Sequence, residues 1–262
     1  MDKYYTKNTT VELCEQLIQQ HIAIGQTDLI IEPSAGNGAF MQCIKTLSPN
    51  YRFYDLEPAN GEIIQQDYLA LDYTDFTSVY QDIHIIGNPP FGRQSSLAIK
   101  FIKKSCEFCN SISFILPKSF KKDSLKKAFP LNFHILCETD LPEKSFLLDG
   151  IECNVPCVFQ IWIKKSYHRE IAEKLEPSHF EFVEKIDMPD ISFRRVGVNA
   201  GKIDTTIDEK SEQSHYFIKF TNGKNRDENI ESLSKSKYEF NNTVGPKSIS
   251  KQELIKEFAK YL

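Results

Sequence analysis

From residue 28 to residue 163, apolar runs of strand length alternate with longer amphipathic stretches. The runs are DLIIE (28–32), YRFYD (51–55), DIHIIG (82–87), SISFILP (111–117), NFHILCE (132–138) and VPCVFQIWI (155–163). Most are apolar at nearly every position, which predicts strands buried on both faces, because a strand with one face in water alternates apolar and polar residues. We therefore predict an α/β fold with a mainly parallel sheet and helices on both of its faces.

Helices are expected between these strands and at both ends of the chain. The intervening stretches predict helices near residues 38–47, 72–80, 95–109 and 119–129. Thr9 followed by Glu12 has the spacing of a capping box at the start of the first helix. Ser250 with Glu253 has the same spacing before the final segment, KQELIKEFAKYL.

The alternating pattern ends near residue 165. Beyond it, SFRRVGV (192–198) and HYFIKF (215–220) are isolated predicted strands between polar stretches. A less regular segment of this length predicts a unit with its own small core. We predict a sheet domain at residues 1–165 and a small α+β unit at residues 166–262.

Composition excludes membrane-spanning and disulfide-stapled classes of protein. No apolar run approaches the ~20 residues that span a bilayer, and the N-terminal MDKYYTKNTT lacks the apolar core of a signal peptide. The seven cysteines, an odd number in mostly apolar segments, are typical of reduced intracellular thiols. We expect a cytoplasmic protein, or one of the nucleoid or nucleus, that is not secreted and binds no membrane.

The net charge of −4 conceals an uneven distribution of charge. Residues 1–92 hold 4 basic and 12 acidic residues, whereas residues 93–127 hold 9 basic and 2 acidic residues. A locally basic segment attracts phosphates whatever the net charge of the chain. The same side chains can also be simply solvated on helix faces, so this feature alone leaves both interpretations open.

Glycines and carboxylates follow the predicted strands at their carboxyl ends, where open α/β sheets bind ligands. IIEPSAGNGAF places Gly36 and Gly38 in the first strand-to-helix turn, where the backbone can approach a ligand closely. This spacing is neither G-x-G-x-x-G nor a P-loop. Asp55 ends the second strand, where it can accept hydrogen bonds from ribose hydroxyls. Asp67 is expected at the end of a third strand, where it can accept a hydrogen bond from an adenine amine. Each feature alone also has an ordinary structural explanation.

IGNPPFG, residues 86–92, ends another predicted strand with Asn88, two prolines and Phe91. Proline fixes its own backbone and pushes the preceding residue into an extended conformation. Glycine or aspartate would turn the chain with less constraint. We infer that this turn holds the Asn88 side chain and a neighbouring carbonyl in fixed positions.

In this order, EPSAGNGAF, DLEP, QQDYL and NPPFG resemble the motifs of S-adenosylmethionine-dependent amino-methyltransferases, especially N6-adenine methyltransferases of the NPPF type. YYTK and FILPKSF resemble segments of DNA adenine methyltransferases with a C-terminal recognition region, and NPPFG also resembles small RNA adenine methyltransferases. The resemblance covers residues 4–163. It implies a class I methyltransferase fold, which is Rossmann-like with a mainly parallel seven-stranded sheet, and S-adenosyl-L-methionine as cofactor.

The resemblance also implies roles for the matching residues. The predicted cofactor-binding residues are Tyr5, Thr6, Glu32, Pro33, Ser34, Gly36, Gly38, Asp55 and Asp67. Among them, Thr6 and Tyr5 would close over the methionine carboxylate. The predicted catalytic residues are Asn88, Pro89, Pro90 and Phe91. Asn88 and the Pro89 carbonyl would accept hydrogen bonds from the target amine. Phe91 would stack on one side of the target base and Phe146 on the other, although Phe146 can equally be a core residue.

These roles explain the stiffness of the NPPFG turn. The lone pair of an adenine N6 amine is delocalised into the ring, so the amine is a poor nucleophile. Two fixed acceptors favour a more tetrahedral nitrogen, and the rate then comes from alignment and preorganised dipoles without a strong base. An aromatic face suits a base that has been taken out of its stack.

The implied partner is nucleic acid, with DNA favoured and RNA possible. The predicted contacts are Arg93, Lys118, Lys121 and Lys122 beside the target site, and Arg194 and Arg195 in the C-terminal unit. DNA is favoured because recognition regions follow the catalytic domain in the subgroup that the chain resembles. The C-terminal unit is small for sequence-specific recognition, and residues 180–262 balance 14 basic against 14 acidic residues, so RNA stays open.

Other interpretations remain open. A protein glutamine methyltransferase also uses an NPP-aromatic loop, and a non-catalytic binding subunit can keep this fold. The chain is expected to be a monomer or loose dimer, with a partner subunit as an alternative.

Two pairs of cysteines, Cys106 with Cys109 and Cys153 with Cys157, have the spacing of zinc ligands. Buried cysteines explain both pairs, so we predict no metal. His84, within a strand, is expected to be a core residue.

Overall fold

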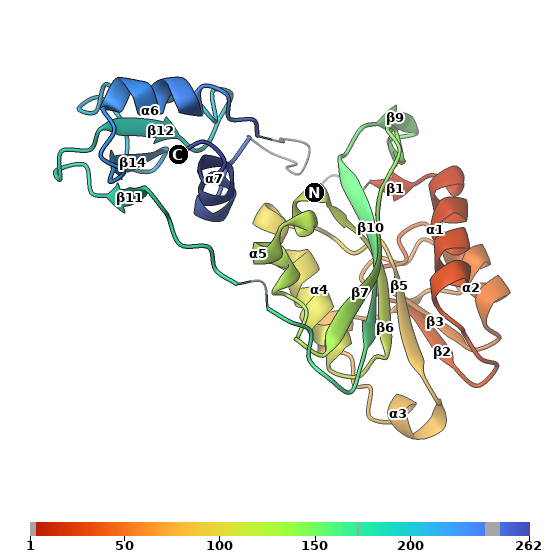
Figure 1. The fold of residues 1–262 in the computed structure, drawn as a ribbon. Helices are drawn as coiled ribbons and strands as arrows, with labels where there is room; N and C mark the ends of the chain where they lie inside the picture. The colour runs from red at the N-terminus through yellow and green to blue at the C-terminus, as the bar shows by residue number, and fades with distance from the viewer. Residues whose placement is uncertain (1–3, 172, 239–246) are drawn as a thin grey trace. The chain divides into compact units, whose positions relative to one another are not determined.

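The computed structural model describes residues 4–171, 173–238 and 247–262. The chain divides into two compact units, Met1–Ile171 and Ala172–Leu262. Figure 1 shows a large twisted sheet between two layers of helices in the first unit and a smaller sheet with helices in the second. Among the described residues, no helix is long and apolar enough to cross a bilayer.

The first unit is built on a seven-stranded sheet with the strand order β4-β3-β2-β5-β6-β10-β7. Its strands are β2 (Leu29–Glu32), β3 (Tyr51–Asp55), β4 (Ile64–Gln65), β5 (Ile83–Gly87), β6 (Ser111–Pro117), β7 (Phe133–Asp140) and β10 (Cys157–Lys164). Strand β10 lies antiparallel between β6 and β7, and the other strands are parallel to one another. Six parallel strands with one antiparallel strand in this position form the class I methyltransferase sheet, which confirms the predicted fold class.

Helices cover both faces of this sheet. The helical segments are α1 (Asn8–His21), α2 (Met41–Leu47), η1 (Tyr68–Ala70), α3 (Phe76–Val79), η2 (Arg93–Ser95), α4 (Ser96–Cys106), η3 (Lys118–Lys121) and α5 (Asp123–Lys126). Helices α1 and α2 lie on one face, and α4 and α5 lie on the other (Figure 1). Alternate residues of β2 enter the two cores: Leu29 and Ile31 pack with α4, and Ile30 packs with α1 and α2. This two-sided burial explains why the strands are apolar at nearly every position.

A separate three-stranded sheet joins the N-terminal segment to a distant hairpin. It has the order β1-β8-β9, with β1 (Tyr5–Thr6), β8 (Phe146–Leu148) and β9 (Ile151–Cys153). In the antiparallel pair of β1 and β8, Thr6 lies opposite Phe146. The pairing therefore fixes the N-terminal segment to residues about 140 positions later in the chain.

The second unit contains a four-stranded antiparallel sheet with the order β11-β14-β12-β13. Its elements are β11 (Phe180–Val183), β12 (Ile191–Arg194), β13 (Ile203–Asp204), β14 (His215–Phe220), α6 (Arg226–Leu233) and α7 (Lys251–Phe258). Phe258 of α7 packs against Phe180 and Phe193 of the sheet. The strand predicted at 215–220 is confirmed as β14, whereas the one predicted at 192–198 is confirmed only in its first part, because β12 ends at Arg194.

The two predicted capping boxes have different outcomes. At Ser250 and Glu253 the capping box is present, with both reciprocal hydrogen bonds. The prediction for Thr9 and Glu12 is wrong, because α1 begins at Asn8 and its N-cap is Lys7, whose side chain makes no capping bond. The Lys7 amide donates to the Ser145 carbonyl at 3.1 Å, so the sheet pairing holds Lys7 as the last extended residue before the helix.

The predicted helix at residues 119–129 is also shorter than expected. The segment instead forms η3 and α5, separated by Lys122, which has an extended backbone. Arg169 holds the connection from α5 to β7, since its guanidinium donates to the carbonyls of four residues: Lys126, Phe129, Pro130 and Phe133.

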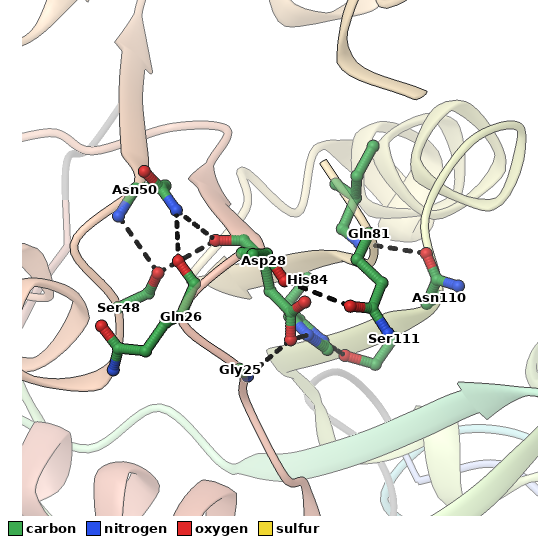
Figure 2. Close-up of polar contacts among 11 residues, drawn as sticks. Gly25, Gln26, Asp28, Ser48, Asn50, Gln81, His84, Asn110 and Ser111 are labelled. Atoms are coloured by element: carbon green, nitrogen blue, oxygen red, sulfur yellow. Dashed lines mark hydrogen bonds and ion pairs between the residues drawn. The ribbon is translucent and has the colours of Figure 1, made fainter. Parts of the chain in front are cut away.

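Figure 2 shows a buried polar network at the amino edge of the sheet, where the strands begin. His84 Nε2 lies 3.3 Å from Asp28 Oδ2, and His84 Nδ1 lies 2.7 Å from Ser111 Oγ. Asp28 Oδ2 also accepts from the Gly25 amide at 2.6 Å. This Asp–His–Ser order resembles a nucleophilic triad, but Ser111 is 1% exposed, so no substrate reaches it. The network is structural, and the prediction that His84 is a core residue is confirmed.

We expect this network to make stability depend on pH. Burial lowers the pKa of His84 below its ordinary value of 6.5 and outweighs the opposing effects of Asp28 and Asp82. The unfolded chain then binds more protons than the folded one just below pH 6.5, so the free energy of unfolding should fall as the pH falls through that range. Urea unfolding of the His84→Gln variant should show a weaker fall than the wild-type protein. The same substitution at the exposed His168 is the control; an equal effect from both variants would contradict the assignment to His84.

Candidate functional site

The topology of the sheet marks one place for a ligand. From β2 the chain proceeds outward to β3 and β4, and then returns to place β5 on the other side of β2. In open α/β sheets, ligands bind beyond the carboxyl ends of the strands at such a switch point. Glu32 ends β2 and Asn88 directly follows β5, so these two residues flank the switch point.

The Asn88 side chain is held at one end and free at the other. Its Nδ2 donates to Thr6 Oγ1 at 3.3 Å, whereas its Oδ1 is buried and has no hydrogen-bond partner in the described part of the chain. The Asn88 carbonyl accepts from Ser34 Oγ at 3.2 Å. An unsatisfied buried acceptor costs about 1–3 kcal/mol, so this oxygen points to a ligand that donates hydrogen bonds.

The backbone after Asn88 is unusually constrained. Phe91 is half-buried and touches both cores of the first unit, and its carbonyl accepts from the amides of Leu97 and Ala98 in α4. Gln94 and Ser95 follow with φ angles of 53° and 62°. Residues other than glycine rarely adopt positive φ, and such strain gathers at functional sites. The NPPF turn is thus fixed to β5 at one end and to α4 at the other.

Glu32 supplies a second buried acceptor. The residue is 2% exposed, and its Oε2 has no hydrogen-bond partner among the described residues. Burial raises the pKa of the Glu32 carboxyl well above its usual range, and the charge of Asp55 raises it further. A ligand with a cationic or N–H donor would satisfy this oxygen and favour its ionised form.

The glycine turn and Asp55 form one hydrogen-bonded unit. Asp55 Oδ2 accepts from the Gly36 amide at 2.8 Å, and Oδ1 accepts from the Glu57 amide at 2.8 Å. Gly38 has a φ of +86°, and a Cβ there would lie 2.5 Å from the Met41 sulfur. The positive φ favours glycine here, and a Cβ would also push the Met41 side chain aside. The predicted ribose acid is therefore joined directly to the predicted cofactor loop.

The N-terminal segment forms a wall opposite the glycine turn. A cavity of about 500 Å³ lies between them. It is lined by Thr6, Lys7, Asn8, Thr9, Asn37, Gly38, Ala39, Gln42 and Leu147. A Cβ on Gly36 would lie 3.6 Å from the Tyr5 ring, so this ring also lies close to the turn. The structure thus brings Tyr5 and Thr6 to the same site as Ser34, Gly36, Asp55 and Asn88.

Asp67 lies at the same edge of the sheet, where its side chain caps the short helix that follows it. Asp55 pairs with Gln65 of β4, two residues before Asp67. The Asp67 carboxylate caps η1 by accepting from the Leu69 amide at 2.9 Å. Leu56, next to Asp55, is 63% exposed at this edge. The sequence alone did not predict that this apolar side chain would be exposed.

Phe146 requires a correction. The side chain is 1% exposed and packs in the core with residues of α1 and α2. Its ring has no open face on which a base could stack, so the structure places Phe146 in the core, against the predicted stacking role. Of the two aromatic residues predicted to stack on the target base, Phe91 remains a candidate.

Lysines of the basic segment form ion pairs with acidic residues of β7. Asp140, at the end of β7, pairs with Lys118 at 2.9 Å and with Lys121 at 3.1 Å, and Glu138 pairs with Lys126 at 2.9 Å. Burial opposes ionisation of Asp140, but hydrogen bonds from the two lysines outweigh it and lower the pKa of this carboxyl. Arg93 is exposed. Sequence reasoning missed these acids because they come from a strand that begins after the basic segment ends.

The arginines of the second unit are also engaged. Arg194 donates to the Val196 carbonyl at 2.8 Å and to Ser214 Oγ at 3.3 Å. Arg195 donates to the Gln213 carbonyl, and its guanidinium carbon lies 5.4 Å from the centre of the Tyr216 ring. Both guanidinium groups support loops of this unit.

The cysteines are placed apart. Cys109 lies at the amino end of β6, whereas Cys157 pairs with Pro117 at its carboxyl end. A strand of seven residues spans roughly 20 Å, so the two cysteine pairs cannot share a metal ion. Burial raises the pKa of Cys106 to about 12. Within residues 4–171, 173–238 and 247–262, no group of three or more His, Cys, Asp or Glu residues has the arrangement of a metal site.

Comparisons with known proteins give distant matches. No protein-family model matches the chain. It is 27% identical over 191 residues to Protein ENHANCED DOWNY MILDEW 2 of Arabidopsis thaliana; the match covers 63% of this chain and 14% of that protein. The chain thus spans about one-seventh of the length of that relative.

Solved structures with a similar arrangement include two rRNA methyltransferases. The 23S rRNA methyltransferase ErmE matches with a TM-score of 0.45 and 9% identity, over 63% of this chain and 71% of its own. An rRNA methylase from Streptococcus thermophilus matches with a TM-score of 0.39 and 13% identity, over 60% of this chain and 94% of its own. Matches at this level do not bear on substrate, so the proposed function rests on the residues of the site.

Proposed function

We propose that this protein is an S-adenosylmethionine-dependent methyltransferase that acts on the N6 amine of adenine in nucleic acid. The observation that carries the proposal is the buried Oδ1 of Asn88, in an NPPF turn at the switch point of the sheet, which has no hydrogen-bond partner among the residues that the structure describes. An acceptor in a turn fixed at both ends is suited to a planar amine, which offers N–H donors but no strong basic group.

The residues at the switch point fit the proposed cofactor. Asp55 can receive ribose hydroxyls beside the glycine turn, and the unpartnered Oε2 of Glu32 can receive the amino group of the methionine moiety. Tyr5 and Thr6 form the wall that would cover this moiety. When bound, S-adenosylmethionine supplies a methyl group on a sulfonium centre.

The chain's own groups would act on the target amine by position. Asn88 Oδ1 and the Pro89 carbonyl would accept from the two amine hydrogens, which localises the lone pair on nitrogen and directs it. Phe91, half-buried at the turn, would offer one face of its ring to the extruded base. His84 lies at the amino edge of the sheet, away from this site. In the proposed mechanism the rate comes from alignment and preorganised dipoles.

Incubation with methyl-labelled S-adenosylmethionine tests the proposal. Duplex DNA, single-stranded DNA, structured RNA and a protein extract should be offered separately, followed by digestion and mass spectrometry of the nucleosides and amino acids. We expect label in N6-methyladenine, with DNA the first polymer to examine because a second compact unit follows the sheet. Label confined to glutamine, or no transfer to any polymer, would overturn the proposal.

The lysines after β6 test the nucleic-acid partner. Replacing Lys121, Lys122, Lys126 and Lys127 with Gln should weaken binding and flatten its salt dependence. On duplex DNA the slope of log affinity against log salt should change by about 0.9 for each phosphate that the variant no longer neutralises. Asp140→Asn is the matched control, since it releases Lys118 and Lys121 from their ion pairs and should strengthen binding. An unchanged slope in the lysine variant would mean that these lysines do not contact nucleic acid.

A further inference from the structure

The N-terminal strand reaches the NPPF turn through one side-chain hydrogen bond. Thr6 and Asn88 are 82 residues apart in the chain, yet Asn88 Nδ2 donates to Thr6 Oγ1 at 3.3 Å. A primary amide carries an N–H₂ donor and a carbonyl acceptor in one plane. When Thr6 Oγ1 accepts from the NH₂ group of Asn88, the amide oxygen is directed away from Thr6. This oxygen is buried and has no hydrogen-bond partner within the described ranges of the chain.

Thr6 is itself held rigidly. Its side chain is 6% exposed, and it lies opposite Phe146 in the antiparallel pair of β1 and β8. Phe146 is anchored in the core, and the next residue after Thr6, Lys7, donates its amide to the Ser145 carbonyl at 3.1 Å. Threonine is also stiff about χ1 because it branches at Cβ. The hydroxyl therefore occupies a fixed position beside the turn.

We propose that Thr6 is a positioning residue that orients the Asn88 amide so that its oxygen faces the target amine. The inference rests on the proposed function and deepens it. The hydrogen bond from Ser34 fixes the Asn88 backbone carbonyl but leaves the side-chain amide free to rotate about χ2, whose energy profile is broad and nearly two-fold. A rotated amide would present N–H₂ donors to the donor amine, so the site needs a group that selects one orientation.

Thr6→Val tests this role, since valine has nearly the same shape but cannot accept a hydrogen bond. The single-turnover rate of methyl transfer should fall roughly 10-fold, the effect of losing one neutral hydrogen bond, and it is measured at saturating cofactor so that weaker cofactor binding by the altered wall of the site does not enter the rate. Thr6→Ser, which keeps the hydroxyl, should recover most of the rate. An unchanged rate, or a loss of cofactor affinity with an unchanged rate at saturation, would overturn the proposal.

Thr10→Val is the matched control. Thr10 is 3% exposed on the same N-terminal segment, and its hydroxyl donates to the Ser145 carbonyl at 3.3 Å and not to the NPPF turn. This variant loses a buried hydroxyl next to the same strand pairing. A rate loss in Thr10→Val equal to that in Thr6→Val would mean that Thr6 acts only through the fold, which overturns the proposal.

A measurement without turnover separates this inference from the proposed function. In ¹⁵N-labelled protein, the side-chain amide signals of Asn88, assigned by their disappearance in Asn88→Asp, should shift in Thr6→Val and stay in place in Thr10→Val. Unmoved signals in Thr6→Val would overturn the positioning role. Wild-type protein that transfers no methyl group would overturn the proposed function, while the amide signals would still decide whether Thr6 holds Asn88.

Discussion

Asn88→Ala is expected to lower the rate of methyl transfer by at least about 100-fold, an effect comparable to removing one preorganised donor or acceptor from other active sites. The variant removes the unpartnered Oδ1 at the switch point and leaves the backbone carbonyl that Ser34 contacts. Cofactor affinity should change little, because the removed acceptor matters mainly for the reacting amine. Single-turnover transfer by folded protein, with cofactor binding measured by calorimetry, gives both quantities.

Asn110→Ala is the matched control for this variant. Asn110 Oδ1 accepts from the Ile83 amide at 3.0 Å at the amino end of β5 (Figure 2), whereas Asn88 follows the carboxyl end of the same strand. The control should lower stability and leave the rate per folded molecule unchanged. A near-normal rate in Asn88→Ala would mean that the NPPF segment is only a stiff turn, and it would overturn the proposed function.

The sheet was predictable because its strands are short, apolar and evenly spaced. DIHIIG and SISFILP became β5 and β6 with ends within one residue of the predicted runs. Parallel strands end at one edge, so residues that follow successive strands must gather there whatever lies between them. This is why Glu32, Asp55 and Asn88, dispersed over 57 positions, can be assigned to one site from the sequence alone.

The contacts of the N-terminal segment could not be predicted in the same way. Strand β1 is two residues long, and its partner β8 lies about 140 residues later in the chain. No local sequence pattern therefore predicts that these two strands pair. That pairing made the Thr9 capping box wrong, placed Phe146 in the core and brought Thr6 to Asn88. The ion pairs of the basic segment could not be predicted for the same reason, because Asp140 meets Lys118 only after β7 joins the sheet.

The second prediction with a large effect concerns the cofactor. Asp55→Ala should weaken binding of S-adenosylmethionine by about 1.5–3 kcal/mol, the range for hydrogen bonds to a charged group. Two effects act together: the ribose hydroxyls lose their acceptor, and the Gly36 amide, now bonded to Asp55 Oδ2 at 2.8 Å, is released. Because the glycine turn then loses its support, the loss should fall at the upper end of that range. Calorimetric titration of the folded variant measures it.

Asp72→Ala separates the role of the site from the role of the turn. Asp72 Oδ1 accepts from the amide two residues on, Thr74, at 3.0 Å, as Asp55 Oδ1 does from Glu57 at 2.8 Å, but Asp72 lies in the connection before α3 and not at the switch point. If Asp55 holds a ligand, only Asp55→Ala weakens binding, although both variants remove a hydrogen bond within a turn. Equal, small effects on both would remove Asp55 from the site, and with it the reason to interpret the glycine turn as a nucleoside-binding element.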